Sequence, residues 1–205
     1  EESRVDGAAE DWDRPAADFH VLAVTCRANG PLAPCGRTPG LANDQYAHDG
    51  QLTKREIRAV TLAMLRPMPG ELLWDIGCGA GSIAVEWVRG APGARAVGLD
   101  RDAATGIEWR EGEAAGILAC KEDPHAAFFG GGLEDGLIER VWARLRPHGR
   151  LVANAVTQES EGLLADCHRR FGGAMRRIAV QTLDPVGRLH AWRPSMPVTQ
   201  WSCVK

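Results

Sequence analysis

The residues of this 205-residue chain best suited to chemistry are three glycines that alternate behind an aspartate, in Asp75-Ile76-Gly77-Cys78-Gly79-Ala80-Gly81. A short apolar run precedes them and an amphipathic segment begins at Ser82, which is typical of a strand, a tight turn and a helix start. Glycines let the backbone pass close to a ligand because they have no Cβ. The N–H groups at the start of a helix favour a polar or negatively charged group. The stretch therefore predicts a site for a nucleotide-like cofactor.

The spacing of this turn indicates which cofactor binds. The dinucleotide fingerprint is G-x-G-x-x-G, but here Ser82 stands where its third glycine would fall. The Asp75 carboxylate would repel a pyrophosphate, whereas it would attract the sulfonium and α-amino groups of S-adenosylmethionine (SAM). A second carboxylate, Asp100, ends the next apolar run and could accept both hydroxyls of a ribose. The pattern resembles motif I of class I SAM-dependent methyltransferases, and the alternative is a tight turn with a surface aspartate.

Alternating strand and helix patterns surround this turn and predict a Rossmann-like, doubly wound α/β fold, with a mainly parallel sheet and an antiparallel closing strand. Thr53 and Glu56 form a capping box for the first expected helix, which ends before Arg66-Pro67. Three tryptophans within these elements, Trp74, Trp87 and Trp142, are expected in the core. The other expected helices are 82–89, 133–145 and 159–171, and the expected strands are 72–75, 95–100, 107–111, 126–129, 150–156, 175–182 and 197–204.

The connection between the second and third expected strands is too short for this fold. Only six residues separate Asp100 from Ile107. A parallel crossover needs about a dozen residues, usually including a helix. We therefore expect that a segment is missing from the sequence near 102–107.

Composition limits the classes of function. Apolar residues make up 44% of the chain, enough for one sizeable domain and a small appendage. A net charge of −3 argues against a nucleic-acid partner, and no apolar run reaches the roughly 18 residues of a membrane span. The six cysteines are scattered, which favours reduced thiols in the cytoplasm over disulfides or a metal site.

Segments outside the glycine turn indicate a particular family. They include H-D-G-Q-L-T-K-R-E-I-R-A at 48–59, F-F-G-G-G-L at 128–133 and G-R-L-V-A-N-A-V-T at 149–157, with P-V-T-Q-W at 197–201. Together they resemble the C-terminal domain of the precorrin-6Y C5,15-methyltransferase (decarboxylating) family of cobalamin biosynthesis. Residues 1–45 hold one strand-like run, 19–25, and a turn-rich stretch. They resemble the tail of an upstream tetrapyrrole-methylase domain and a linker, with a disordered leader as the alternative, and 46–205 form the methyltransferase domain.

The resemblance implies an activity. It implies SAM-dependent methylation at C15 of precorrin-6B with loss of CO₂ from the C12 acetate, and S-adenosylhomocysteine as the second product. It further implies a polycarboxylated tetrapyrrole substrate, a C5-methylating domain upstream and a homo-oligomer, with a tetramer as the expected form. The fused architecture favours the metal-free substrate over the cobalt-containing one.

The resemblance also implies cofactor contacts, although it identifies no catalytic residue. Glu113 stands where an aspartate is frequent, and its carboxylate could accept from the adenine amino group. The expected cofactor-binding residues are Thr53, Asp75, Gly77, Cys78, Gly79, Ala80, Gly81, Asp100, Glu113 and Ala114.

Substrate contacts are expected at two places near the turn. Lys54 and Arg58 lie four residues apart, on one helix face, and could bind propionates, or they could form a solvated face. Gly130-Gly131-Gly132 would let a flat macrocycle approach the methyl group, or would form a flexible loop. His48 could pair with a carboxylate or act as an acid, although a linker histidine is the simpler interpretation.

Three other functions fit the glycine turn. The chain could methylate a different small molecule or a protein, or it could be a non-catalytic SAM-binding module. A dehydrogenase fits least, because of the G-x-G-x-G spacing and the leading Asp75.

Overall fold

The computed structural model describes residues 36–47, 52–100, 108–111 and 114–205, within a compact unit formed by Cys35–Lys205. Five sequence-based expectations fall outside these residues: the strand at 19–25, the nature of residues 1–34, His48, the missing segment near 102–107, and Glu113. For Asp100 and Ala114 the backbone alone is described.

A seven-stranded sheet forms the centre of the unit, in the order β3-β2-β1-β4-β5-β9-β6. Neighbours from β3 to β5 are parallel, β9 is antiparallel to β5, and β6 is antiparallel to β9. The expected class I architecture, with its antiparallel closing strand, is therefore present. The strands are β1 (Leu72–Ile76), β2 (Arg95–Asp100), β3 (Glu108–Glu111), β4 (Ala126–Phe129), β5 (Arg150–Ala155), β6 (Ala174–Ile178) and β9 (Val198–Val204).

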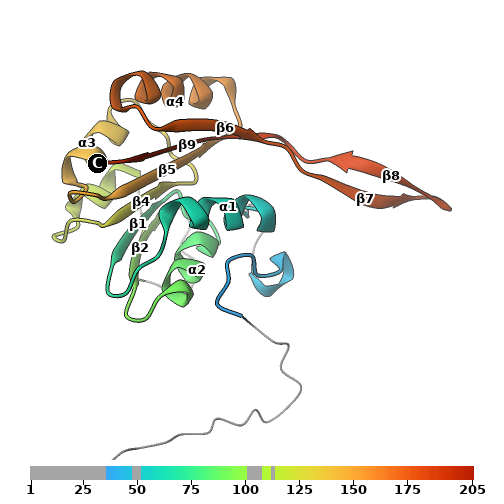
Figure 1. Ribbon diagram of the computed structural model, residues 1–205, viewed down its shortest axis with the longest axis horizontal. Helices are drawn as coiled ribbons and strands as arrows, with labels where there is room; N and C mark the ends of the chain where they lie inside the picture. Colours follow the sequence, from blue (N-terminus) through green and yellow to red (C-terminus); the bar gives the residue numbers. More distant parts are fainter. Residues whose placement is uncertain (1–35, 48–51, 101–107, 112–113) are drawn as a thin grey trace, which may run out of the picture. The chain divides into compact units, whose positions relative to one another are not determined.

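Helices cover both faces of the sheet (Figure 1). One face carries α1 (Arg55–Leu65) and α2 (Ser82–Gly90), and the other carries α3 (Leu137–Arg144) and α4 (Gln158–Phe171). Short 3-10 turns, η2 (Asn43–Gln45) and η3 (Ala114–Ala119), complete the described helices. Two apolar clusters, one on each face, hold the layers together. Trp74 and Trp87 are fully buried as expected, and Trp142 packs partly buried against the core.

The predicted start of α1 is wrong. The helix begins at Arg55 with Lys54 as its N-cap, and no side chain bonds the cap. The Thr53 carbonyl instead accepts a hydrogen bond from Arg58 Nη1 at 2.5 Å. At α4, by contrast, the Thr157 hydroxyl accepts from the N–H of Ser160 at 3.3 Å, as an N-cap does.

A hairpin of β7 (Gln181–Val186) and β8 (Leu189–Pro194) was missed by the sequence analysis, which expected one strand over 175–182. The strand β6 ends at Ile178, and the hairpin continues beyond the end of the sheet (Figure 1). Every side chain of β8 is exposed. Periodicity failed here because the hairpin has no buried face in the chain to impose alternation.

Candidate cofactor and substrate site

The glycine turn lies where β1 meets α2, at the carboxyl edge of the sheet. Gly77, Gly79 and Gly81 have φ angles of 66°, 51° and 67°, in the left-handed region that favours glycine. The N–H groups of Gly77 and Cys78 donate to the carbonyl of Leu99 in β2, at 2.9 and 3.3 Å. The turn is therefore shaped by its glycines and fixed to the neighbouring strand.

The loop after β4 packs directly against this turn. A Cβ on Gly77 would lie 2.6 Å from the backbone of Gly131, and one on Gly130 would lie 2.7 Å from the carbonyl oxygen of Gly77. Because β1 and β4 flank the point where the strand order reverses, the contact lies where ligands bind in such sheets. Gly77 and Gly130 are thus required for close loop packing. At Gly131 a Cβ would meet no described atom within 4 Å, so this position is open to a ligand.

Asp75 connects the turn to its helix. Its side chain is fully buried, and Oδ2 accepts a hydrogen bond from the N–H of Ala84 at 3.1 Å. A carboxylate at the first turn of α2 also complements the positive end of the helix dipole. The side chain of Cys78 is buried, and its carbonyl accepts a hydrogen bond from the N–H of Gly81 at 2.8 Å, so the backbone of this residue closes the turn.

Arg58 is not available to a substrate, so its predicted role is wrong. Its side chain is fully buried and forms an ion pair with Glu86, from Nε to Oε1 at 2.5 Å. It also donates to the carbonyls of Leu41 and Thr53. The partner Glu86 follows 28 residues later, on α2, so helical spacing alone did not reveal the pair. Lys54 is exposed, and its role remains a prediction.

The Arg58–Glu86 pair anchors the segment that enters the domain. The Glu86 carboxylate accepts from the N–H groups of Gly40 and Leu41, at 2.6 and 3.0 Å, and from the Tyr46 hydroxyl at 2.9 Å. Burial and the bond to Glu86 raise the pKa of Tyr46 well above its usual value. The pair therefore holds residues 40–46 against α1 and α2, with the Tyr46 ring 4.7 Å from the Arg58 guanidinium.

A buried polar cluster at the same edge was missed by the sequence analysis. Asn154 Nδ2 and Gln200 Nε2 donate to Thr61 Oγ1 at 3.2 and 3.1 Å, and Gln200 Nε2 also lies 3.0 Å from Asn154 Oδ1. Thr61 and Gln200 are fully buried. The available signal was Asn154, a polar residue in an otherwise apolar strand run.

Two further residues predicted to bind the cofactor lie at the ends of described elements. Asp100 ends β2 next to the glycine turn, and Ala114 begins η3. In the described part of the chain, no group of three or more histidine, cysteine, aspartate or glutamate side chains could hold a metal ion. Among the helices of those residues, none has the length and apolar character needed to cross a bilayer.

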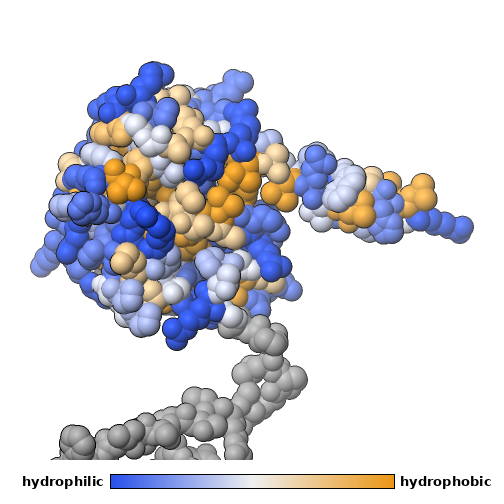
Figure 2. Space-filling view, in the orientation of Figure 1, coloured by the Kyte–Doolittle hydropathy of each residue, from blue (hydrophilic) through white to orange (hydrophobic). Residues whose placement is uncertain are grey.

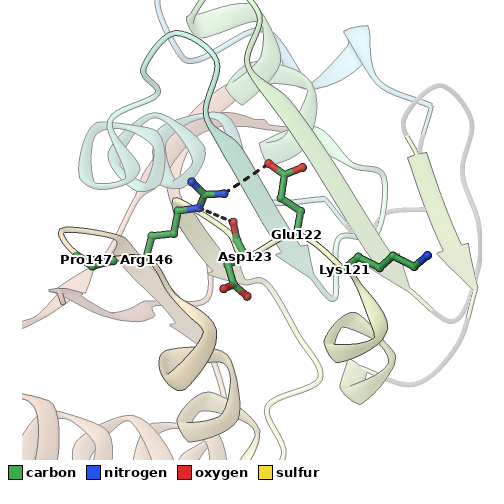
Figure 3. Close-up of a pocket in the computed structure, with 5 residues that line it drawn as sticks. All are labelled: Lys121, Glu122, Asp123, Arg146 and Pro147. Atoms are coloured by element: carbon green, nitrogen blue, oxygen red, sulfur yellow. Dashed lines mark hydrogen bonds and ion pairs between the residues drawn. The ribbon is translucent and has the colours of Figure 1, made fainter.

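Two pockets of the described structure lie at the opposite, amino edge of the sheet. One of about 600 Å³ is lined by Lys121, Glu122, Asp123, Arg146 and Pro147, which precede β4 and β5 (Figure 3). Arg146 donates to the carbonyl of Asp123 at 3.0 Å and lies 3.8 Å from Glu122. A second pocket, of about 380 Å³, adjoins it beside His125 and Arg150. Both pockets lie on the edge away from the glycine turn, and they include the ion pairs of Arg146 with Glu122 and of Arg150 with Glu71.

Comparison with known proteins identifies the family. The sequence profile described as "Precorrin methyltransferase domain" matches residues 44–205. The chain belongs to this family. A precorrin-6Y C(5,15)-methyltransferase [decarboxylating] of Mycobacterium tuberculosis is 41% identical over 221 residues, covering 100% of this chain and 55% of that protein. A cobalt-precorrin-6B C(15)-methyltransferase (decarboxylating) of Salmonella typhimurium is 31% identical, covering 75% of this chain and 89% of that protein.

A solved structure supports the same assignment. The C-terminal domain of precorrin-6Y C5,15-methyltransferase from Rhodobacter capsulatus is 41% identical, with a TM-score of 0.77. The match covers 83% of this chain and 100% of that domain. Our chain spans about half the length of the fused curated relatives it matches. The precorrin methyltransferase domain and its class I fold are therefore present here as predicted.

Proposed function

We propose that this domain transfers a methyl group from SAM to C15 of precorrin-6B and releases CO₂ from the C12 acetate. The observation that carries the proposal is the left-handed glycine turn behind buried Asp75, at the strand-order reversal of a precorrin methyltransferase domain. The turn fits the cofactor, because its glycines keep side chains away from the carboxyl edge.

Named groups of the chain would hold SAM, which supplies an electrophilic methyl group when bound. The backbone of Gly77–Gly81 and the carboxylate of Asp75 would hold its methionine end together with Thr53. Asp100 would accept the ribose hydroxyls, and Glu113 with Ala114 would hold the adenine. Methyl transfer is an in-line displacement, so the main contribution of the protein is to position two reactants.

Decarboxylation needs no further cofactor in this scheme. The electrons left by the departing CO₂ pass into the conjugated macrocycle, and a proton replaces the carboxylate on the acetate carbon. The protein would assist by excluding water from the reacting acetate while cations hold the other carboxylates. Exposed Lys54 and the open side of Gly131 are where the chain would meet the substrate.

We further propose that the functional protein is a cytoplasmic homo-oligomer, with a tetramer as the expected form, and that a C5-methylating domain precedes this one. The hairpin of β7 and β8 supports the homo-oligomer, because isolated two-stranded hairpins are marginally stable in water. Leu189 and Trp192 of the hairpin are 75% and 66% exposed. Figure 2 shows hydrophobic surface, in orange, along the projecting hairpin. A second copy of the chain would cover these side chains. Light scattering should give a multiple of the chain mass, and Trp192→Glu should reduce it; a monomeric wild type would contradict the proposal.

The activity is tested by incubating the protein with precorrin-6B and SAM and following the product by mass spectrometry. The expected product has gained one methyl group and lost one CO₂. Asp75→Ala should abolish product and S-adenosylhomocysteine binding together. Tight S-adenosylhomocysteine binding without transfer to any precorrin would favour a SAM-binding module, and transfer to other acceptors alone would favour a different methyltransferase.

A further inference from the structure

A row of polar side chains crosses the last three strands of the sheet. In the strand register, Asn154 on β5 pairs with Gln200 on β9, and Gln200 pairs with Arg176 on β6. Directly paired residues point to the same face of a sheet. That face is the one covered by α1, since both amides bond Thr61 of this helix. The row therefore joins the α1 face to the outer strand β6.

This row stands at the same level as the cofactor turn. The register aligns Ile76, Phe129 and Ala153, so the next position along each strand holds Gly77, Gly130 and Asn154. From β4 to β6 there are three strand spacings of about 4.8 Å, which places Arg176 about 14 Å across the edge from the Gly130 loop. A large, flat acceptor whose methylated carbon lies at the glycine turn would extend along this edge.

Arg176 is oriented by neutral groups. Its Nη1 donates to Gln200 Oε1 at 3.4 Å and to Ser202 Oγ at 3.2 Å. The Gln200 amide is itself fixed, because its Nε2 donates to Thr61 and Asn154 and its Oε1 is left to accept from Arg176. Among the described residues, no carboxylate pairs with Arg176, whose side chain is half-buried. An arginine has five N–H donors, so most of them remain for a ligand.

The neighbouring arginine shows the contrasting arrangement. Arg177 lies on the opposite face of β6, where its Nη2 pairs with Glu161 at 2.7 Å and its Nε donates to Thr199 Oγ1. Its charge is therefore balanced within the protein. The two residues share a strand and a charge but differ in face and partner, which makes Arg177 a matched control.

We propose that Arg176 binds a carboxylate of the tetrapyrrole acceptor, and that Gln200, held by Thr61 and Asn154, is the residue that positions it. Arginine suits the task because its planar fork can donate two parallel hydrogen bonds to one carboxylate. The inference rests on the proposed function, since it takes the acceptor to be a polycarboxylated macrocycle. It gives Arg176 the role that Arg58 cannot have.

Steady-state kinetics with precorrin-6B and SAM test this assignment in Arg176→Gln, Arg176→Lys and the control Arg177→Gln. Loss of a charged hydrogen bond predicts that Arg176→Gln raises KM for precorrin-6B about tenfold or more. The affinity for S-adenosylhomocysteine and the Tm should stay at wild-type values. Arg176→Lys should recover part of the loss, because lysine keeps the charge without the fork. Arg177→Gln should leave KM unchanged.

The outcomes separate the two proposals. If the wild type neither binds nor methylates precorrin-6B, the proposed function fails. If the wild type is active and Arg176→Gln has an unchanged KM, or if Arg177→Gln raises KM equally, the assignment of Arg176 is overturned. Should Arg176→Gln lose its folded transition, Arg176→Lys decides: an unchanged KM with an unchanged Tm would overturn the assignment.

Discussion

At the amino edge of the sheet, Arg150 is buried against the Glu71 carboxylate and the carbonyls of Leu65 and Arg66. At the carboxyl edge, by contrast, the partners of the Arg176 guanidinium among the described residues are the neutral groups of Gln200 and Ser202. Three other arginines near the amino edge also have acidic partners. These pairs are Arg95 and Arg146 with Glu122, and Arg144 with Asp123.

The difference distinguishes the pocket at the amino edge from the binding site that we propose at the carboxyl edge. Of the residues that line the pocket in Figure 3, Glu122, Asp123 and Arg146 already have partners within the protein. At the carboxyl edge, the glycines at 77, 130 and 131 place no side chain over the backbone. Arg176 at this edge has most of its N–H donors available to a ligand. Pocket volume alone would favour the amino edge, whereas the glycine turn and the N–H donors of Arg176 support the site that we propose at the carboxyl edge.

The largest expected effect comes from the buried pair at the amino edge. Arg150→Met leaves the Glu71 carboxylate, 13% exposed, without its partner. Breaking a buried pair in this way costs about 3–5 kcal/mol, which should lower the Tm by roughly 10 °C. Thermal unfolding of the two proteins measures this. A Tm within 2 °C or so of wild type would show that the amino edge is not a structural anchor.

A pair of glycine variants tests the carboxyl edge. Gly77→Ala combines a left-handed φ of 66° with a contact of 2.6 Å, so the turn must shift. We expect a loss of about 1–3 kcal/mol of stability, and an affinity for S-adenosylhomocysteine at least about tenfold weaker. Calorimetric titration provides the measurement.

Gly131→Ala is the matched control in the same pair of loops, because its Cβ meets no described atom. It should keep wild-type stability and cofactor affinity. A higher KM for precorrin-6B in this variant would show that the open side of Gly131 faces the acceptor. Equal losses in both variants would remove the distinction between packing and ligand-facing glycines.

Acid should weaken the amino edge in two steps. Burial, together with the charge of Arg146, lowers the pKa of His125 below its usual 6.5. The stability that neutral His125 provides is therefore complete above pH 6.5 and declines as the pH falls from 6.5 through the lowered pKa. Burial alone would raise the pKa of Glu71, but the hydrogen bond and charge of Arg150 outweigh it, so the pKa lies below 4.5.

Glu71 therefore contributes stability above pH 4.5 that is lost as the pH falls further, through its lowered pKa. Urea unfolding from pH 8 down to about pH 2 measures both steps. The variant His125→Gln should lose the upper step and keep the lower one. Persistence of the upper step in His125→Gln would assign it to another group.

The smallest effect is expected at the rim of the amino-edge pocket. Glu122 pairs with Arg95, but their side chains are 40% and 56% exposed. Exposed pairs contribute about 0–1 kcal/mol, so Glu122→Gln should change the free energy of unfolding by less than about 1 kcal/mol. Its kcat and KM should match the wild type. A clear loss of activity would show that the amino-edge pocket takes part in function.

Several elements were predictable because their signals are local. The strands at 95–100 and 126–129 have the expected bounds, since buried parallel strands are short apolar runs between turn residues. The turn at Gly77–Gly81 was also predictable, because left-handed backbone and a helix start depend on neighbouring residues. The predicted Thr53 cap was wrong because α1 begins at Arg55 with Lys54 as its N-cap. The hairpin at 181–194 was missed because it lacks a buried face.

The sequence by itself determined the alternation of strands and helices around the glycine turn, the turn itself and the family of the domain. Only the tertiary structure decided which arginines can meet a ligand. Glu86, which pairs with Arg58 and makes it unavailable, lies 28 residues away in the sequence. Thr61, which bonds the Gln200 that orients Arg176, lies 139 residues from Gln200. Burial and ion pairing depend on residues that only folding brings together. The sequence shows where an arginine stands, but it does not show whether the N–H donors of that arginine are available to a ligand.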